Sequence, residues 1–184
     1  MTGALLIVDY SNDFIADAGA MSCGAAGQAL DGNILRQAEQ ALARQYFVFI
    51  CNDEHHQGDP FDPEAALFPP HNLAGSWGAE IYGQTGAFVR RMQEQGSDRI
   101  VYVPKLRYSA FFGTPLDYLL RSRGVDELIV AGVCTDICVL HTVIAAVYEG
   151  YRVKVPADCC ATIFEHGQEW ALRHLRDCLN VEII

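Results

Sequence analysis

Short, continuously apolar runs rich in β-branched residues recur along this 184-residue chain, and they constrain its fold more than any other feature. Runs without apolar/polar alternation are typical of parallel strands that are covered on both faces. Helical patterns separate the runs, and such alternation predicts helices on both sides of a parallel sheet. We therefore expect a three-layer α/β/α sandwich around a six-stranded parallel sheet built from residues 4–8, 46–50, 99–103, 127–133, 152–155 and 181–184.

Four segments between these runs have the apolar spacing of amphipathic helices: 31–45, 114–124, 135–150 and 165–179. Asp31 is expected to cap the first of them. The length is that of one domain and no linker or repeat interrupts it, so residues 1–184 are predicted to form a single domain. Only the connection from residue 52 to about residue 85 interrupts the alternation of predicted strands and helices. Long loops inside a compact domain are usually functional or disordered.

Composition excludes several classes of partner. The formal net charge is −10 and the acidic residues are spread along the chain, which argues against nucleic acid or an anionic membrane surface. No apolar run approaches the roughly 20 residues that span a bilayer, and the N-terminus lacks the pattern of a signal peptide. Seven cysteines, an odd number in a chain of this size, indicate reduced thiols and a cytoplasmic location.

Chemically active side chains follow several of the predicted strands. Asp9 follows the first strand, Lys105 follows the third, and Cys138 lies in the helix after the fourth. Ligands of parallel α/β sheets bind outside the carboxyl ends of the strands, which is where these side chains converge. A capping aspartate, a solvated lysine and a packed cysteine are the structural alternatives. Their shared position favours a site, and so does the choice of a lysine in a chain with eleven arginines and two lysines.

These three residue types suit acyl transfer through a thioester. A cysteine in the first turn of a helix feels the helix dipole, and a neighbouring ammonium stabilises its thiolate further. Asp9 could accept the thiol proton and later pass it to a leaving amine. Backbone N–H groups at the start of the helix could hold the oxyanion of the tetrahedral intermediate.

The segments that contain these residues resemble the isochorismatase-like cysteine hydrolases. The resemblance covers about residues 4 to 165 and is strongest in "LLIVDYSNDFI" and "GVCTDICVLHT", with Lys105 between them; within the family it is closest to the bacterial nicotinamidases (pyrazinamidases). It implies that Asp9, Lys105 and Cys138 are a catalytic triad. It also implies a cis peptide between Val133 and Cys134, with the backbone amides of Cys134 and Cys138 forming an oxyanion hole.

The same resemblance implies a divalent metal site beside the triad. Its ligands would be Asp53 and His55 in the "CNDEHH" stretch, His71, and Glu64 from the intervening loop. In an extended segment residues 53 and 55 point the same way, while His56 points away from them. Mixed carboxylate and imidazole ligands favour Zn²⁺, with Mn²⁺ or Fe²⁺ as alternatives, over Ca²⁺.

Three aromatic residues, Phe14, Phe68 and Tyr108, would shape the substrate pocket by this resemblance. An aromatic sandwich suits a flat heteroaromatic ring. Core or lid packing is the alternative for each of them. Trp77, in the long connection, could close the site or form a subunit contact.

The predicted function is that of a metal-assisted cysteine amidohydrolase that converts nicotinamide to nicotinate and ammonia through a thioester. Its partner is a small molecule, nicotinamide or an analogue, and no organic cofactor is implied. The family further implies a role in NAD salvage and a homo-oligomeric assembly.

Two alternatives remain at the level of sequence. A related cysteine hydrolase could use the same triad on N-carbamoyl, ureido or other small amides without the complete metal set. Isochorismate cleavage is disfavoured because the nucleophilic cysteine is present. The remaining alternative is a non-catalytic module that binds metal or senses redox state.

Overall fold

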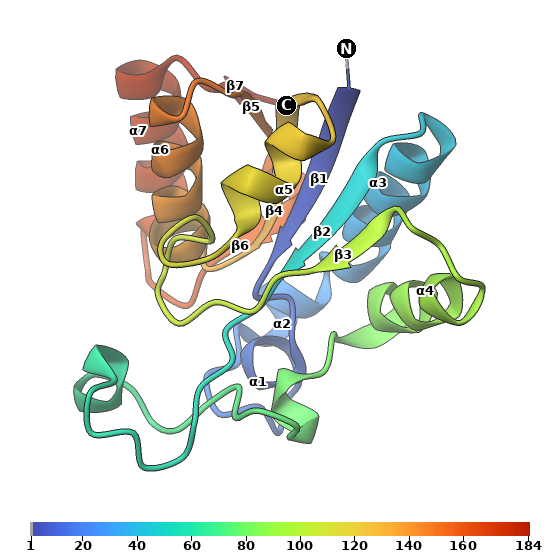
Figure 1. Ribbon diagram of the computed structural model, residues 1–184. Helices are drawn as coiled ribbons and strands as arrows, with labels where there is room; N and C mark the ends of the chain where they lie inside the picture. The colour runs from blue at the N-terminus through green and yellow to red at the C-terminus, as the bar shows by residue number, and fades with distance from the viewer. Residues whose placement is uncertain (1) are drawn as a thin grey trace.

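The computed structural model describes residues 2–184, and a parallel sheet runs through its centre (Figure 1). The strand order is β3-β2-β1-β4-β5-β7, and every pairing in this sheet is parallel. These strands are β1 (Thr2–Val8), β2 (Phe47–Cys51), β3 (Ile100–Tyr102), β4 (Val125–Val133), β5 (Arg152–Val155) and β7 (Glu182–Ile183). They correspond to the six predicted runs, so the predicted fold class is confirmed.

A seventh strand, β6 (Cys160–Ala161), was not predicted. It pairs with Gly132 and Val133 at the end of β4, whereas β5 pairs with Glu127–Ile129 nearer the start of that strand. A strand of two residues is too short to show a pattern of apolar residues, so it could not be predicted from the sequence. The six-stranded sheet is therefore extended to seven strands without a change of architecture.

Helices cover both faces of the sheet (Figure 1). One face carries α3 (Asp31–Ala43) and α4 (Gly83–Glu94), and the other carries α5 (Leu116–Ser122), α6 (Leu140–Tyr148) and α7 (Gly167–Leu179). The short helices α1 (Asn12–Ile15) and α2 (Gly24–Gln28) follow β1. The four predicted helices are present, the third entered through a π-helical turn, η3 (Thr135–Val139). Helix α4 was not predicted, because three of its first four residues, Gly83, Thr85 and Gly86, are weak helix formers.

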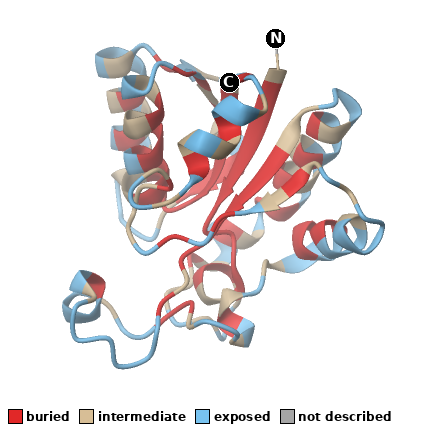
Figure 2. Ribbon diagram, in the orientation of Figure 1, coloured by how far each residue is buried: buried red, intermediate tan, exposed pale blue. Residues whose placement is uncertain are grey.

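The strands are buried on both sides, which accounts for their continuous apolar sequence (Figure 2). In β1, Leu5 and Ile7 pack in the core cluster under α3 and α4. The alternate residue Leu6 packs in the cluster under α5 and α6. Successive strand side chains point to opposite faces, so both faces need apolar residues. None of the described helices is long and apolar enough to cross a membrane.

Asp31 does not cap its own helix, contrary to the prediction. Leu30 occupies the N-cap position of α3, and Asp31 is the first helical residue. Its carboxylate instead accepts hydrogen bonds from the backbone N–H groups of Gln84 (2.7 Å) and Thr85 (3.0 Å) at the start of α4. The sequence pattern was local, whereas the unsatisfied N–H groups that this carboxylate meets come from a helix more than 50 positions later.

The long connection after β2 lies beyond the carboxyl ends of the strands (Figure 1). It contains two short 3₁₀ turns, η1 (Pro63–Ala66) and η2 (Trp77–Ala79), and otherwise irregular backbone. A third 3₁₀ turn, η4 (Ala157–Cys159), precedes β6. This connection and the strand ends together form the candidate site.

Candidate active site

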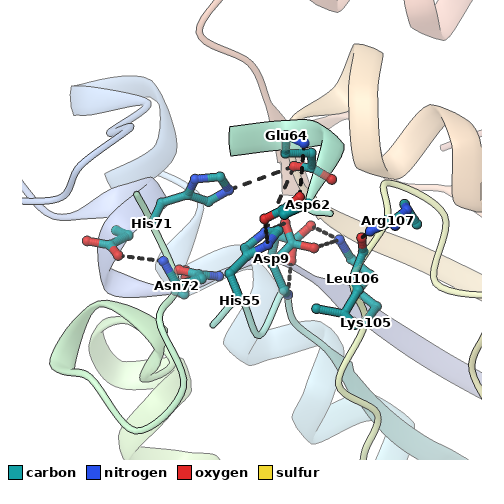
Figure 3. Close-up of polar contacts among 12 residues, drawn as sticks. Asp9, His55, Asp62, Glu64, His71, Asn72, Lys105, Leu106 and Arg107 are labelled. Atoms are coloured by element: carbon teal, nitrogen blue, oxygen red, sulfur yellow. Dashed lines mark hydrogen bonds and ion pairs between the residues drawn. The ribbon is translucent and has the colours of Figure 1, made fainter. Parts of the chain in front are cut away.

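The structure brings Asp9, Lys105 and Cys138 together at the edge of the sheet, as the sequence predicted. Asp9 directly follows β1, Lys105 follows β3, and Cys138 lies in η3 after β4. Lys105 Nζ is 2.7 Å from Asp9 Oδ2, and both side chains are fully buried (Figure 3). Cys138 Sγ lies within 4.8 Å of a carboxylate oxygen of Asp9 and of Asp53. The thiol and the carboxylate are therefore within reach of a proton transfer.

Asp53 belongs to the same buried charge cluster. Its Oδ1 is 2.6 Å from Lys105 Nζ, and its backbone N–H donates to Asp9 Oδ1 at 2.7 Å. One ammonium group thus lies between two carboxylates. Because buried charges are tolerated only when they are paired, Lys105 compensates both acids at once.

Burial and this shared ammonium set the protonation states at the sheet edge. Burial alone would lower the pKa of Lys105, but the carboxylates of Asp53 and Asp9 outweigh it and hold that pKa well above its usual value. Burial and the charge of Asp53 raise the pKa of Asp9 to about 7, against the opposing effect of Lys105. Asp9 is therefore a carboxylate whose proton affinity matches neutral pH.

The expectation of a stabilised thiolate at Cys138 is wrong. Burial, together with the nearby charges of Asp9 and Asp53, raises the pKa of Cys138 well above its usual value, and Lys105 offsets this only in part. The ammonium that should have favoured the thiolate is already neutralised by two carboxylates. The nearby ammonium therefore does not lower the net pKa of Cys138 below its usual value.

The four predicted metal ligands, Asp53, His55, Glu64 and His71, also converge. Each offers one ligand atom, and the four atoms all lie within 4.8 Å of one another in buried positions. His55 Nε2 is 3.9 Å from Asp53 Oδ2 and 3.9 Å from Glu64 Oε2, and His71 Nε2 is 3.9 Å from the same glutamate oxygen (Figure 3). These separations are too long for hydrogen bonds. His56 is exposed and stays outside the group, as predicted.

The outer nitrogen of each histidine has an oxygen partner. His55 Nδ1 lies 2.8 Å from Asp62 Oδ2, and His71 Nδ1 lies 2.8 Å from the carbonyl oxygen of Pro69. For His71, a proton on Nδ1 that donates to the Pro69 carbonyl leaves the lone pair of Nε2 facing the cluster. Asp62 was not predicted, because nothing in its spacing from His55 marks it as a partner.

The cluster fits a divalent ion by its donor set. Asp53 Oδ2 and His55 Nε2 are buried and have no hydrogen-bond partner among the described residues. Burial and the charge of Asp53 raise the pKa of Glu64 to about 8, and burial lowers the pKa of His71. Two carboxyl side chains and two imidazole side chains form a ligand set that Zn²⁺, Mn²⁺ and Fe²⁺ accept.

A small, partly open cavity lies between Cys138 and the metal cluster. The three predicted pocket aromatics, Phe14, Phe68 and Tyr108, all line it. Phe14 and Phe68 meet the His71 ring edge to face, with centroid distances of 5.3 and 6.2 Å. The sequence analysis missed Met21 and Ile137, which complete the apolar wall. Trp77 is half exposed and is not part of this wall.

The peptide bond between Val133 and Cys134 is cis, as the resemblance implied. Cys134 also lines the cavity beside Cys138. The assignment of the Cys134 and Cys138 amides to an oxyanion hole stays a prediction.

With this geometry in hand, comparison with known proteins places the chain in a family. The family model described as the isochorismatase domain matches residues 3–183. The chain belongs to the isochorismatase family. It is 37% identical to the protein described as "Uncharacterized isochorismatase family protein PncA" of Bacillus subtilis strain 168, over 100% of this chain and 99% of that protein.

Solved structures of family members have the same fold. The crystal structure of nicotinamidase/pyrazinamidase PncA from Bacillus subtilis superposes with a TM-score of 0.95 at 37% identity, covering 100% of this chain and 99% of that one. The crystal structure of pyrazinamidase/nicotinamidase from Streptococcus mutans UA159 superposes with a TM-score of 0.95 at 39% identity, covering 100% of both chains. The resemblance found in the sequence is therefore confirmed.

Proposed function

We propose that this protein is a metal-assisted cysteine amidohydrolase that converts nicotinamide to nicotinate and ammonia. One observation carries the proposal: a single aromatic-lined cavity is bordered by Cys138 and by Asp53, Glu64 and His71, three of the four residues of the metal cluster. A flat heteroaromatic amide has a use for each part, namely ring walls, a contact for a ring nitrogen and a nucleophile for the carboxamide. The names of the related structures support the same substrate.

Cys138 begins the reaction as a thiol, and Asp9 activates it. The Asp9 carboxylate takes the thiol proton as Sγ attacks the carboxamide carbon, which forms a tetrahedral intermediate. The backbone amides of Cys134 and Cys138 stabilise its oxyanion. The intermediate collapses as Asp9 returns the proton to the leaving nitrogen, so ammonia departs and a nicotinoyl thioester remains on Cys138.

A water molecule completes the reaction. Asp9 takes one proton from this water while its oxygen attacks the thioester carbon, and cleavage of the C–S bond releases nicotinic acid, which gives its remaining proton to solvent and becomes nicotinate. The proton on Asp9 then returns to the Cys138 sulfur, which restores the starting state. Lys105 keeps its proton throughout, because two carboxylates hold its pKa high, and it fixes the orientation of Asp9.

Asp53, His55, Glu64 and His71 would hold the metal ion, which we propose to be Zn²⁺, with Mn²⁺ and Fe²⁺ as alternatives. When bound, the ion supplies a Lewis-acid contact for the ring nitrogen of the substrate. Phe14, Phe68 and Tyr108 confine the ring, so that the carboxamide faces Cys138. We further place the reaction in NAD salvage, in the cytoplasm, and in a homo-oligomer of single-domain chains.

The test is ammonia release from nicotinamide by the purified protein with Zn²⁺ bound, after chelation, and after metal is returned. The control is Cys138→Ser, which keeps a similar side-chain volume but replaces the thiol with a hydroxyl, a poorer nucleophile. We expect turnover with metal, a loss on chelation that is reversed by metal, and essentially no turnover in the variant.

The other outcomes identify the alternatives. Turnover of N-carbamoyl or ureido compounds that survives chelation would instead indicate a related cysteine hydrolase of those amides. Metal binding without ammonia release from any amide would indicate a non-catalytic module.

A further inference from the structure

Asn72 links the two histidines of the metal cluster. It directly follows His71, and its carbonyl oxygen accepts a hydrogen bond from the backbone N–H of His55 at 3.0 Å. The next contact along the chain runs the other way, from the N–H of Ala74 to the carbonyl oxygen of His55 at 2.9 Å. The backbones that carry His55 and His71 are therefore joined at Asn72.

Residues that follow the catalytic Asp9 hold Asn72 in place. Asp13 Oδ2 accepts the backbone N–H of Asn72 at 2.7 Å, and Asn72 Oδ1 accepts a hydrogen bond from Ser11 Oγ at 2.8 Å. Asp13 Oδ1 accepts a further N–H, from Ala20, at 3.2 Å. Asn72 is completely buried and has a φ of 43°, in the left-handed region that asparagine tolerates better than most residues.

The space around the Asp13 carboxylate is shaped to admit it. A Cβ atom added to Gly78 would lie 2.0 Å from Asp13 Oδ2, which is an impossible contact. Glycine at this position therefore lets the carboxylate reach the N–H of Asn72. Neither the catalytic chemistry nor the ligand set described above uses Asp13.

We propose that Asp13 is a positioning residue that acts through Asn72 to hold His71 opposite His55, and thereby sets the affinity of the cluster for its metal ion. The inference rests on the proposed function, because it takes these histidines as ligands. Groups that orient metal ligands commonly change metal affinity by 10-fold to 100-fold when they are replaced. The Asp13 carboxylate can change metal affinity in this way because it fixes the backbone of Asn72, next to the ligand His71.

The chain contains a matched control in Asp31. Its carboxylate likewise accepts two backbone N–H groups, from Gln84 and Thr85, at 2.7 and 3.0 Å. A glycine, Gly83, again makes room for it, since an added Cβ would lie 2.4 Å from Asp31 Oδ2. This second carboxylate joins α3 to the start of α4, and neither helix carries any of the four ligand residues.

The experiment compares Asp13→Asn with Asp31→Asn in the full chain. Each substitution keeps the side-chain shape, removes the charge and replaces one acceptor oxygen. After metal removal, the affinity for Co²⁺ is measured by competition with a chromophoric chelator, and the visible absorption of bound Co²⁺ reports ligand geometry. We expect Asp13→Asn to weaken Co²⁺ binding by about 10-fold to 100-fold and to shift the absorption bands. Asp31→Asn should leave both within about twofold of the wild type, even if the two variants lose similar stability.

Equal Co²⁺ affinities and identical spectra in the two variants would overturn the inference. If Asp13→Asn does not fold, Ser11→Ala decides, because it removes only the hydroxyl that binds Asn72. That variant should weaken Co²⁺ binding by several fold, and an unchanged affinity would overturn the inference.

Ammonia release separates this inference from the proposed function. Suppose the wild-type protein binds Co²⁺ with an affinity that depends on Asp13 but releases no ammonia from nicotinamide. That result would refute nicotinamide as the substrate and leave the role of Asp13 intact. A wild-type protein that binds no divalent ion would refute the ligand assignment and this inference with it.

Discussion

The sheet edge and the long connection after β2 build their halves of the site in different ways. At the sheet edge, the backbone that carries Asp9 and Lys105 continues the strand ladder, with N–H groups donating to the carbonyls of Cys51 (3.1 Å) and Asn52 (2.9 Å). In the connection, His55, Glu64 and His71 lie on irregular backbone or a short 3₁₀ turn. The core thus positions the triad, whereas a few polar contacts position the metal cluster.

The two regions also differ in how they balance charge. Lys105 compensates the acids at the sheet edge from within the chain. In the connection, the acidic side chains of Asp53 and Glu64 lie beside two histidines, and burial together with the charge of Asp53 raises the pKa of Glu64 to about 8. The first region balances its charges within the chain, and the second would gain a counter-charge from the ion of the proposed function. Four predictions test this difference, beginning with the largest effect.

Replacement of Lys105 by methionine should destabilise the fold severely. The change leaves Asp9 and Asp53 buried together without a counter-charge, so we expect the free energy of unfolding to fall by about 3–5 kcal/mol. The matched change in the connection, Glu64→Gln in metal-free protein, should cost less than about 1 kcal/mol, because Glu64 is already largely protonated at neutral pH. Urea denaturation at pH 7 measures both, and equal losses would remove the distinction between the regions.

Asp9→Asn should lower kcat/KM by about 10²-fold to 10⁴-fold, because the general base is lost. In the wild type, kcat/KM should rise with pH through about 7, where Asp9 loses its proton. The raised pKa also means that folding favours the protonated acid, so its stability contribution is full at low pH and is lost as the pH rises through about 7. Asp9→Asn should therefore gain stability relative to the wild type between pH 5 and pH 8. A wild-type rate that does not change across this range would contradict the role of Asp9.

A divalent ion should stabilise the protein through the connection. Zn²⁺ at about 100 times its Kd should add about 2.7 kcal/mol to the free energy of unfolding. At a fixed Zn²⁺ concentration the gain should be smaller at pH 6 than at pH 8, because Glu64 holds a proton up to about pH 8 and must release it to bind the ion. Thermal unfolding with and without metal measures this. Glu64→Gln should remove most of the pH dependence, and a wild-type Tm that ignores metal would refute the cluster as a site.

Phe68→Leu should have the smallest effect. The ring lines the cavity and meets His71 edge to face, so its loss should raise KM for nicotinamide by several fold, equivalent to about 1 kcal/mol, with little change in kcat. Phe61→Leu is the control, because that ring lies in the same connection but is 86% exposed. Steady-state kinetics decide the matter, and a KM that changes equally in both variants would place Phe68 outside the substrate pocket.

Sequence patterns were sufficient for the sheet and for the convergence of the site residues. Continuous apolar runs indicate the strands of a parallel sheet. Residues that follow such runs, like Asp9 and Lys105, lie at the same edge of the sheet. The resemblance to a known family then assigned His71 and Glu64, which no local pattern connects to Asp53. The two-residue strand β6 and the Gly-rich start of α4 carry too little signal for such reasoning.

Contacts between distant segments were beyond the reach of the sequence. Asp13 lies 59 positions from Asn72, and Asp31 lies 53 positions from Gln84, so the partner of each carboxylate depends on the finished fold. The protonation of Cys138 was missed for a similar reason. Lys105 alone would favour a thiolate, but only the structure reveals that two carboxylates share its charge.

Asp53 divides its two oxygens between the two halves of the site, Oδ1 toward Lys105 and Oδ2 toward the metal cluster. For protein engineering this means that the two halves of the site cannot be transferred independently of each other. A designer who transfers Cys138, Asp9 and Lys105 to a scaffold without the metal must provide another cation near Asp53 Oδ2. Otherwise Lys105 alone has to compensate the whole negative charge of Asp53. Conversely, under the proposed function, adding or removing the divalent ion would change the electrostatic potential at Cys138 through Asp53 without altering any residue.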